Sequence, residues 1–174
     1  MRKPGKLKMR AGVSVALMTF IAAAPAAESA KDTEARNAAA GFAITTSLTL
    51  LESLGRQCGT YEGKAGSQAR AALQGWQQRN NRYLEPSLQR VLMLTDAVTA
   101  AAGEAEGQTF AAARKAEFTG AATTALRALF PEGEVTTAAC TRIATATQSG
   151  EYDYQRHAEF FPTLQAMAQA GATK

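Results

Sequence analysis

Apolar residues recur at every third or fourth position along most of this chain, which is the spacing of one helix face. The clearest case begins near residue 32, and no proline interrupts residues 32–57. The spacing predicts a first helix over about 32–57, with the stripe facing the core and its last residue directed inward near the helix end. The members of the stripe are Gly41, Ile44, Leu48, Leu51, Gly55 and Cys58.

Four further helical segments follow, and glycine and proline residues mark their ends. We expect a loop over 59–67 with Ser67 capping a second helix, and Pro86 both ending that helix and starting a third. The cluster GEAEG at 103–107 predicts the next turn, with Thr109 capping a fourth helix. A single helix running through 103–107 is the alternative. The predicted ranges are about 68–84, 86–102, 110–130 and 135–148.

The C-terminal segment carries a cluster of aromatic residues. Gly150 stands where a helix C-terminus favours glycine, so the fifth helix should end just before it. We expect a short helix from about Asp153, a break or kink at Pro162, and a last helical turn or two to about residue 170. The aromatic side chains are predicted to cover the open end of the bundle, and an exposed patch that recruits another protein is the alternative. They are Tyr152, Tyr154, Phe160 and Phe161.

These patterns predict the fold class. No stretch alternates between apolar and polar residues as a half-buried strand does, so we expect an all-α protein: a compact bundle of five to six helices without a sheet. Alanine is abundant and large aliphatic residues are few, which lets helices approach closely but buries little area at each contact. Residues 27–174 are 148 in number, a length that fits a single helical domain with one core.

The first 26 residues have the three-part layout of a secretory signal peptide. Five basic residues and no acidic residue occupy positions 1–10, an apolar run of about 14 residues follows, and small residues flank Pro25. The apolar run is short for a membrane span. We predict cleavage after Ala26, with a site nearer Ser29 as the second choice and an uncleaved anchor as the alternative. The mature protein is then expected in the periplasm, or secreted, without a stable membrane span.

Removal of the signal peptide changes the charge of the chain. It contains five of the 19 basic residues and none of the 15 acidic ones, which leaves 14 basic and 15 acidic residues. The net charge of +4 for the whole chain therefore becomes −1. A nearly neutral domain lacks a general attraction to phosphate backbones or anionic lipid, so we expect no nucleic-acid partner.

Two cysteines, Cys58 and Cys140, remain after cleavage. An exported compartment oxidises paired thiols, so we predict a disulfide between them. The bond would close a loop of about 83 residues, for which chain entropy gives an upper guide of roughly 4 to 5 kcal/mol. Two free buried thiols or an intermolecular bond are the alternatives.

The stretch from residue 73 to 94 contains the most distinctive side chains of the chain, including its only tryptophan. An indole, a guanidinium, an amide and a phenol on one helix face can clamp a polar ligand or a partner's carboxylate. We favour the structural interpretation, in which the aromatic rings pack in the core while the polar groups satisfy loop carbonyls and helix ends. The candidates for ligand or partner binding are Trp76, Arg79, Asn80, Arg82 and Tyr83.

His157 is the only histidine. Asp153 lies four residues earlier on the predicted helix and Glu159 lies nearby, an arrangement that suits a general base or two metal ligands. A zinc site needs three or four ligands, so we expect no metal and interpret His157 as a surface or capping residue. Helix content alone supports a haem held by His157 with Met93 or Met167, so we expect no cofactor.

The sequence lacks the motifs of covalent haem attachment, zinc proteases, nucleophile elbows and phosphate-binding loops. We therefore expect a non-enzymatic binding or interaction protein, such as an envelope accessory factor, an inhibitor or an immunity-like protein with another envelope or secreted protein as its partner. The alternative is a small metal-dependent or acid-base hydrolase that uses His157 with Asp153 or Glu159. The sequence does not predict an oligomeric state.

Overall fold

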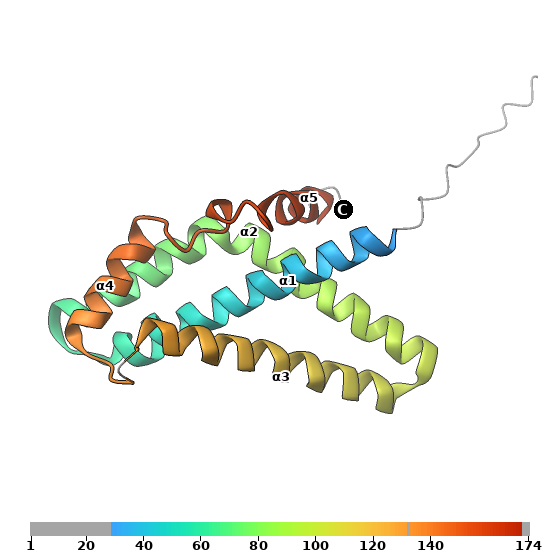
Figure 1. The fold of residues 1–174 in the computed structure, drawn as a ribbon, viewed down its shortest axis with the longest axis horizontal. Helices are drawn as coiled ribbons and strands as arrows, with labels where there is room; N and C mark the ends of the chain where they lie inside the picture. The colour runs from blue at the N-terminus through green and yellow to red at the C-terminus, as the bar shows by residue number, and fades with distance from the viewer. Residues whose placement is uncertain (1–28, 132, 172–174) are drawn as a thin grey trace, which may run out of the picture.

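The computed structural model describes residues 29–171 except residue 132, so the predicted signal peptide lies outside the described residues. Within them the chain forms five α-helices, three short helical turns and no strand. The long helix α2 packs against each of the other α-helices. Figure 1 shows α3 running beneath α1, with α4 and α5 lying along α2. The predicted all-α bundle is confirmed. The α-helices are α1 (Ala30–Leu50), α2 (Gly63–Ala102), α3 (Glu104–Leu129), α4 (Thr137–Gln148) and α5 (Phe161–Gly171).

Small residues form most of the buried face of α1, which corrects the predicted stripe in part. Ser29 caps the helix by accepting a hydrogen bond from the backbone N–H of Asp32. Leu48 and Leu51 were expected in the core, but they are 37% and 38% exposed. Alanine and serine side chains occupy that face because they let neighbouring helices approach more closely than leucine does. Ile44, also in the predicted stripe, is buried as expected. The buried residues of α1 are Ala39, Ala40, Ala43, Ile44, Ser47, Thr49 and Leu50.

The end of the first helix is not a regular α-helix. The turn η1 (Leu51–Gln57) is π-helical, and the N–H of Cys58 donates to the carbonyl of Ser53, five residues earlier. A 3₁₀ turn, η2 (Cys58–Thr60), follows. The wider turn rotates the residues after it relative to the face of α1. Cys58 is fully buried at this point, which confirms its predicted inward direction.

Helix α2 corrects two predicted boundaries. It begins at Gly63, so Ser67 lies within its first turns rather than capping it, and it continues through Pro86 instead of ending there. Proline lacks the N–H that donates a hydrogen bond inside an α-helix, and its ring crowds the preceding turn, so a proline inside a helix bends it. The helix can continue through the bend where residues on both sides of the proline are packed in the core. Tyr83 and Ser87 are buried on either side of Pro86, and the Ser87 hydroxyl donates to the Tyr83 carbonyl at 2.8 Å. Figure 1 shows the resulting bend in the middle of α2.

A glycine separates α2 from α3. Gly103 has φ +107°, so the predicted end of the helix near residue 102 is confirmed and the alternative of one continuous helix is wrong. Helix α3 begins at Glu104, earlier than predicted, and Thr109 lies inside it with its hydroxyl donating to the Ala105 carbonyl. The two helices approach closely at Gly107, where a Cβ atom would lie 1.9 Å from the Thr99 hydroxyl oxygen.

The C-terminal segment follows the predicted order with two corrections. Thr136 caps α4 by accepting a hydrogen bond from the Ala139 N–H, and Gly150 has φ +80° just after that helix, as predicted. The segment after Asp153 forms one 3₁₀ turn, η3 (Tyr154–Arg156), rather than an α-helix. Pro162 is the second residue of α5 and does not break it, because the first turn of a helix does not need the N–H that proline lacks.

The aromatic cluster of the C-terminal segment packs on the core, as favoured from the sequence. Tyr154 is fully buried, and Tyr152, Phe160 and Phe161 pack against the core cluster. The Tyr154 ring makes an edge contact with Trp76 at 5.4 Å between centroids. These large rings fill the space that the alanine-rich helices leave between them.

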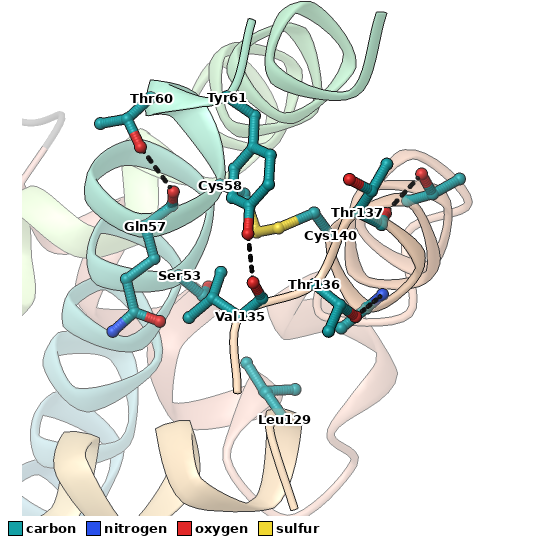
Figure 2. The surroundings of a disulfide bond; sticks show 12 residues. Ser53, Gln57, Cys58, Thr60, Tyr61, Leu129, Val135, Thr136, Thr137 and Cys140 are labelled. Atoms are coloured by element: carbon teal, nitrogen blue, oxygen red, sulfur yellow. Dashed lines mark hydrogen bonds between the residues drawn. A yellow bond between two sulfur atoms is a disulfide. The ribbon is translucent and has the colours of Figure 1, made fainter. Parts of the chain in front are cut away.

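The predicted disulfide joins Cys58 to Cys140, whose Cα atoms lie 5.4 Å apart. It links the first residue of η2 to α4, and both cysteines are fully buried. Figure 2 shows the Tyr61 hydroxyl directed at the Val135 carbonyl, to which it donates a hydrogen bond. The disulfide therefore fastens α4 to the end of the first helical segment. Helix α4 is short and has few large apolar residues of its own. A disulfide in the fold also indicates an oxidising compartment.

The helical stretch Ala30–Thr60 is long and apolar enough to cross a membrane by length and composition alone. Half of its most apolar window is buried inside the protein. A central helix of a folded domain and an apolar segment near an exported N-terminus both have these properties, so the stretch is not by itself evidence of a membrane span.

Replacing both cysteines tests the contribution of the disulfide. We expect the double variant Cys58→Ala/Cys140→Ala to lose about 2 to 5 kcal/mol of unfolding free energy, because the unfolded chain is no longer constrained by a long closed loop. Urea unfolding followed by circular dichroism measures the change. Wild-type protein unfolded in reductant is the control, and equal stability of the oxidised wild type and the double variant would contradict the expectation.

Candidate functional site

A buried carboxylate, that of Asp153, links the turn after α4 to the centre of α2. Arg79 donates to it twice, from Nε to Oδ2 at 2.8 Å and from Nη2 to Oδ1 at 3.1 Å. Asn80 donates from Nδ2 to Oδ1 at 2.9 Å. The Asp153 side chain is 4% exposed, whereas that of Arg79 is 39% exposed. A buried carboxylate loses its hydrogen bonds to water, and a forked guanidinium contact of this kind replaces them with two charged hydrogen bonds.

The same two α2 residues also hold the backbone around Asp153. Arg79 Nη2 donates to the Thr147 carbonyl at 2.8 Å, at the end of α4. The Asn80 amide oxygen accepts the Tyr154 N–H at 3.0 Å, and its Nδ2 also donates to the Trp76 carbonyl at 2.9 Å. The irregular turn is thus fixed by side chains rather than by its own backbone hydrogen bonds alone.

Two aromatic residues extend this network to other helices. The indole Nε1 of Trp76 donates to the Tyr152 carbonyl at 3.0 Å. The hydroxyl of Tyr154 donates to the Ala43 carbonyl of α1 at 2.8 Å.

Burial raises the pKa of the Tyr154 phenol above its usual value of 10.0. The pKa of Tyr152 is also raised, first by burial and then by the neighbouring carboxylate of Glu151.

The residues singled out between 73 and 94 divide into two groups. Trp76, Asn80 and Tyr83 are buried, so the favoured interpretation of this face as part of the core is confirmed for them. Arg79 and Arg82 reach the surface, and the Arg82 guanidinium lies 4.6 Å from the centre of the Tyr83 ring. A ligand-binding role for this group stays a prediction.

The structure does not place Asp153 and His157 on one face of an α-helix, because the chain between them forms the 3₁₀ turn η3. Both carboxylate oxygens of Asp153 accept hydrogen bonds from α2. His157 instead contacts the Phe42 ring, with 4.6 Å between ring centres, and Glu159 is exposed. Among the described residues, no three His, Cys, Asp or Glu side chains are grouped as metal ligands.

A shallow depression of about 360 Å³ lies over the Asp153 network. Its walls include Arg79, Arg82 and Tyr83 from α2, and Gln155 from η3. The only carboxylate in its lining is Asp153, which is already engaged by Arg79 and Asn80. The depression therefore presents amide and guanidinium groups without a carboxylate that is available for acid-base chemistry.

A larger groove of about 690 Å³ lies on the other side of Arg82, between the bent part of α2 and the C-terminal half of α5. Arg82 lines both hollows. The groove also takes one residue, Arg36, from α1. Its charged and polar lining consists of Arg36, Arg82, Glu85, Gln89 and Arg90. Its apolar lining consists of Pro86, Met93, Met167, Ala168, Ala170 and Gly171.

Sequence reasoning missed most of this groove. Pro86 was interpreted as the end of a helix, whereas it bends α2 and forms part of the groove wall. Met93 and Met167 were considered only as haem ligands, although each is a flexible apolar side chain suited to an irregular binding surface. Its lining comes from α1, α2 and α5, and helical spacing along one segment does not reveal which residues of different helices lie near one another.

No protein-family model, curated protein or solved structure matches the chain. A function for the chain therefore has to be inferred from its own geometry and chemistry.

Truncating Asp153 tests how much the buried carboxylate contributes. We expect Asp153→Ala to lower the unfolding free energy by about 2 to 4 kcal/mol, because it removes the forked contact with Arg79 and one of the two acceptors of the buried Asn80 amide. Glu117→Ala is a matched control: Arg114 donates to Glu117 at 2.8 Å, and the side chains are 40% and 57% exposed. The two arginines are about equally exposed, but Glu117 is exposed and accepts from Arg114 alone, whereas Asp153 is buried. The control should therefore lose less than about 1 kcal/mol. Equal losses in urea unfolding would contradict this account.

The raised pKa of Tyr154 predicts a loss of stability in alkaline solution. Between the unfolded-state value of 10.0 and the higher folded-state value, the folded protein keeps a proton that the unfolded chain releases, so the unfolding free energy falls as the pH rises above about 10. Tyr154→Phe should lose about 0.5 to 1.5 kcal/mol at neutral pH with the hydrogen bond to Ala43, and should show a shallower decline above pH 10. Urea unfolding between pH 8 and 11 measures both. An identical decline in the two proteins would refute the role of Tyr154.

Proposed function

We propose that the protein is an exported helical binding protein that does not catalyse a reaction, and that its binding surface is the groove between α2 and α5. Its compartment is the periplasm or the cell exterior. The layout of the first 26 residues and the Cys58–Cys140 disulfide support export to an oxidising compartment. The groove is the single observation that carries the binding function.

The composition of the groove supports this proposal. Binding sites are typically concave and mostly apolar with a few convergent polar groups, and their volumes are about 300 to 1,000 Å³. The groove has a volume of about 690 Å³, and its lining combines methionine, proline and alanine with arginine. Arginine and methionine are also enriched at protein interaction surfaces.

The acid-base alternative has less support from the contacts. Asp153 is engaged with Arg79 and Asn80, and His157 packs on Phe42. A general base needs a carboxylate or imidazole within reach of a bound substrate. Neither hollow includes His157 or Glu159 in its lining.

A matched pair of variants tests the groove as a binding surface. Met93 lines the groove and is 58% exposed, whereas its neighbour Leu92 is 55% exposed and lies outside the lining. Each substitution to glutamate adds the same charge on adjacent, exposed positions of one helix, so both variants should fold. We expect native mass spectrometry of protein recovered from its own cell envelope to show an associated component with the wild type and with Leu92→Glu, and its loss with Met93→Glu.

Two results of that experiment would contradict the proposal. The first is recovery of the wild-type protein alone at low ionic strength. The second is equal retention of the associated component by the two variants. Melting temperatures of the three proteins serve as the control for folding.

A further inference from the structure

The side of α2 that lines the groove has opposite charges at its two ends. Arg82, Gln89 and Met93 all line the groove, so they lie on one side of the helix. Asp96 follows Met93 by three residues, which places it one turn further along the same side. Arg82 and Asp96 are both exposed, and neither forms an ion pair with another described residue. The Arg82 guanidinium rests on the Tyr83 ring, a contact that does not neutralise its charge.

The residues between these two charges are apolar or carry an amide. Pro86 follows Arg82 by about one helical turn, Met93 precedes Asp96 by about one turn, and Gln89 lies midway between the charges. Met93 is 58% exposed, so a partner on this side of α2 would remove much apolar surface from water. The order along the helix is therefore a cation, an apolar side chain, an amide, an apolar side chain and an anion.

This order is complementary to itself when the direction of the helix is reversed. In an antiparallel pair of α2 helices with a twofold axis at Gln89, Arg82 of each copy lies opposite Asp96 of the other. Pro86 of each copy then lies opposite Met93 of the other. The two Gln89 amides meet at the axis, where each can donate a hydrogen bond to the other and accept one from it. Such an interface uses the same surface on both copies, which is the commonest symmetry among homo-oligomers.

The groove offers space for the second helix. On the α5 side it is lined by Met167, Ala168 and Gly171. Alanine and glycine let a neighbouring helix approach closely, and methionine adapts its shape to an irregular surface. The α2 helix of one copy can thus lie in the groove of the other, with an α5 helix on each outer side.

The size of this surface indicates a reversible association. The charges at positions 82 and 96 are separated by about 21 Å along the helix, and two helices side by side are about 20 Å wide. The groove side therefore offers a footprint of roughly 400 Å² to a partner, whereas a stable interface covers roughly 800 Å² on each partner. We expect a dimer that dissociates on dilution.

We propose that the groove between α2 and α5 binds a second copy of the chain, with the two α2 helices antiparallel about a twofold axis at Gln89. Ion pairs between Arg82 and Asp96 then form twice across the interface, because the symmetry uses each residue twice. This inference rests on the proposed binding function and names the partner of the groove. Neither a small ligand nor an unrelated protein requires a surface that is complementary to itself.

Analytical ultracentrifugation of the mature, oxidised protein tests the proposal. We expect the sedimentation coefficient to rise from the monomer value to the dimer value between about 1 and 500 µM, the range in which small interfaces dissociate. Arg82→Glu and Asp96→Lys should each raise the dissociation constant at least about tenfold, because each places two pairs of like charges in the interface. The double variant Arg82→Glu/Asp96→Lys exchanges the signs and should restore the wild-type constant to within about threefold.

Two further variants locate the interface. Met93→Glu should raise the dissociation constant at least about tenfold, since it places a carboxylate against the partner's Pro86 and near the partner's Glu85. Leu92→Glu adds the same charge outside the groove lining and should change the constant less than about threefold. The recovery expected from the double charge variant cannot be explained by a folding defect, because that variant carries both substitutions.

Three results would overturn the inference: a monomer at every concentration, a double charge variant that associates no better than the single variants, or equal losses with Met93→Glu and Leu92→Glu. The failure of this inference differs from that of the proposed function. If the protein stays monomeric but another envelope component associates in a Met93-dependent manner, the partner is wrong and the binding function stands. If nothing associates with the groove, both are wrong.

Discussion

The structure depends on one buried carboxylate, that of Asp153, and on the two α2 side chains that compensate its charge. A carboxylate removed from water is unfavourable unless charge and hydrogen bonds replace the lost solvent, and Arg79 and Asn80 provide both. Because the same two residues also bind the Thr147 carbonyl and the Tyr154 N–H, the turn after α4 has one favourable position on α2. The large rings of the C-terminal segment are then placed over an alanine-rich core that cannot fill the space by itself.

Helix α2 combines this anchor with the proposed binding surface, which extends across the bend at Pro86. Before the bend, Trp76 and Asn80 face the core, and their hydrogen bonds reach Tyr152, Asp153 and Tyr154. From Arg82 through the bend to Met93, exposed side chains of α2 line a groove with α5. A straight helix would not turn its second half in this way, so the proline contributes to the shape of the groove as well as to the path of the chain.

The sequence predicts those features that local chemistry determines. Helical spacing predicts the fold class, and Gly103 and Gly150 mark helix ends through their positive φ values. The predicted signal peptide together with an even number of cysteines predicts the Cys58–Cys140 bond. The buried face of α1 could not be found in the same way, because it consists mainly of alanine and serine while Leu48 and Leu51 are exposed. The contact between Arg79 and Asp153 joins residues 74 positions apart, and the groove joins α1, α2 and α5. No local pattern encodes such long-range convergence.

Hydrogen exchange at single amides tests the role of the Asp153 network most directly. The Tyr154 N–H lies in an irregular segment, where amides usually exchange through local opening, but here it donates to the buried Asn80 side chain. The account predicts that this amide exchanges only when the whole domain unfolds, with the same opening free energy as core amides of α2 near Trp76. Exchange of the Tyr154 amide orders of magnitude faster than those core amides would show that the turn opens independently, and would contradict the claim that the network holds the fold together.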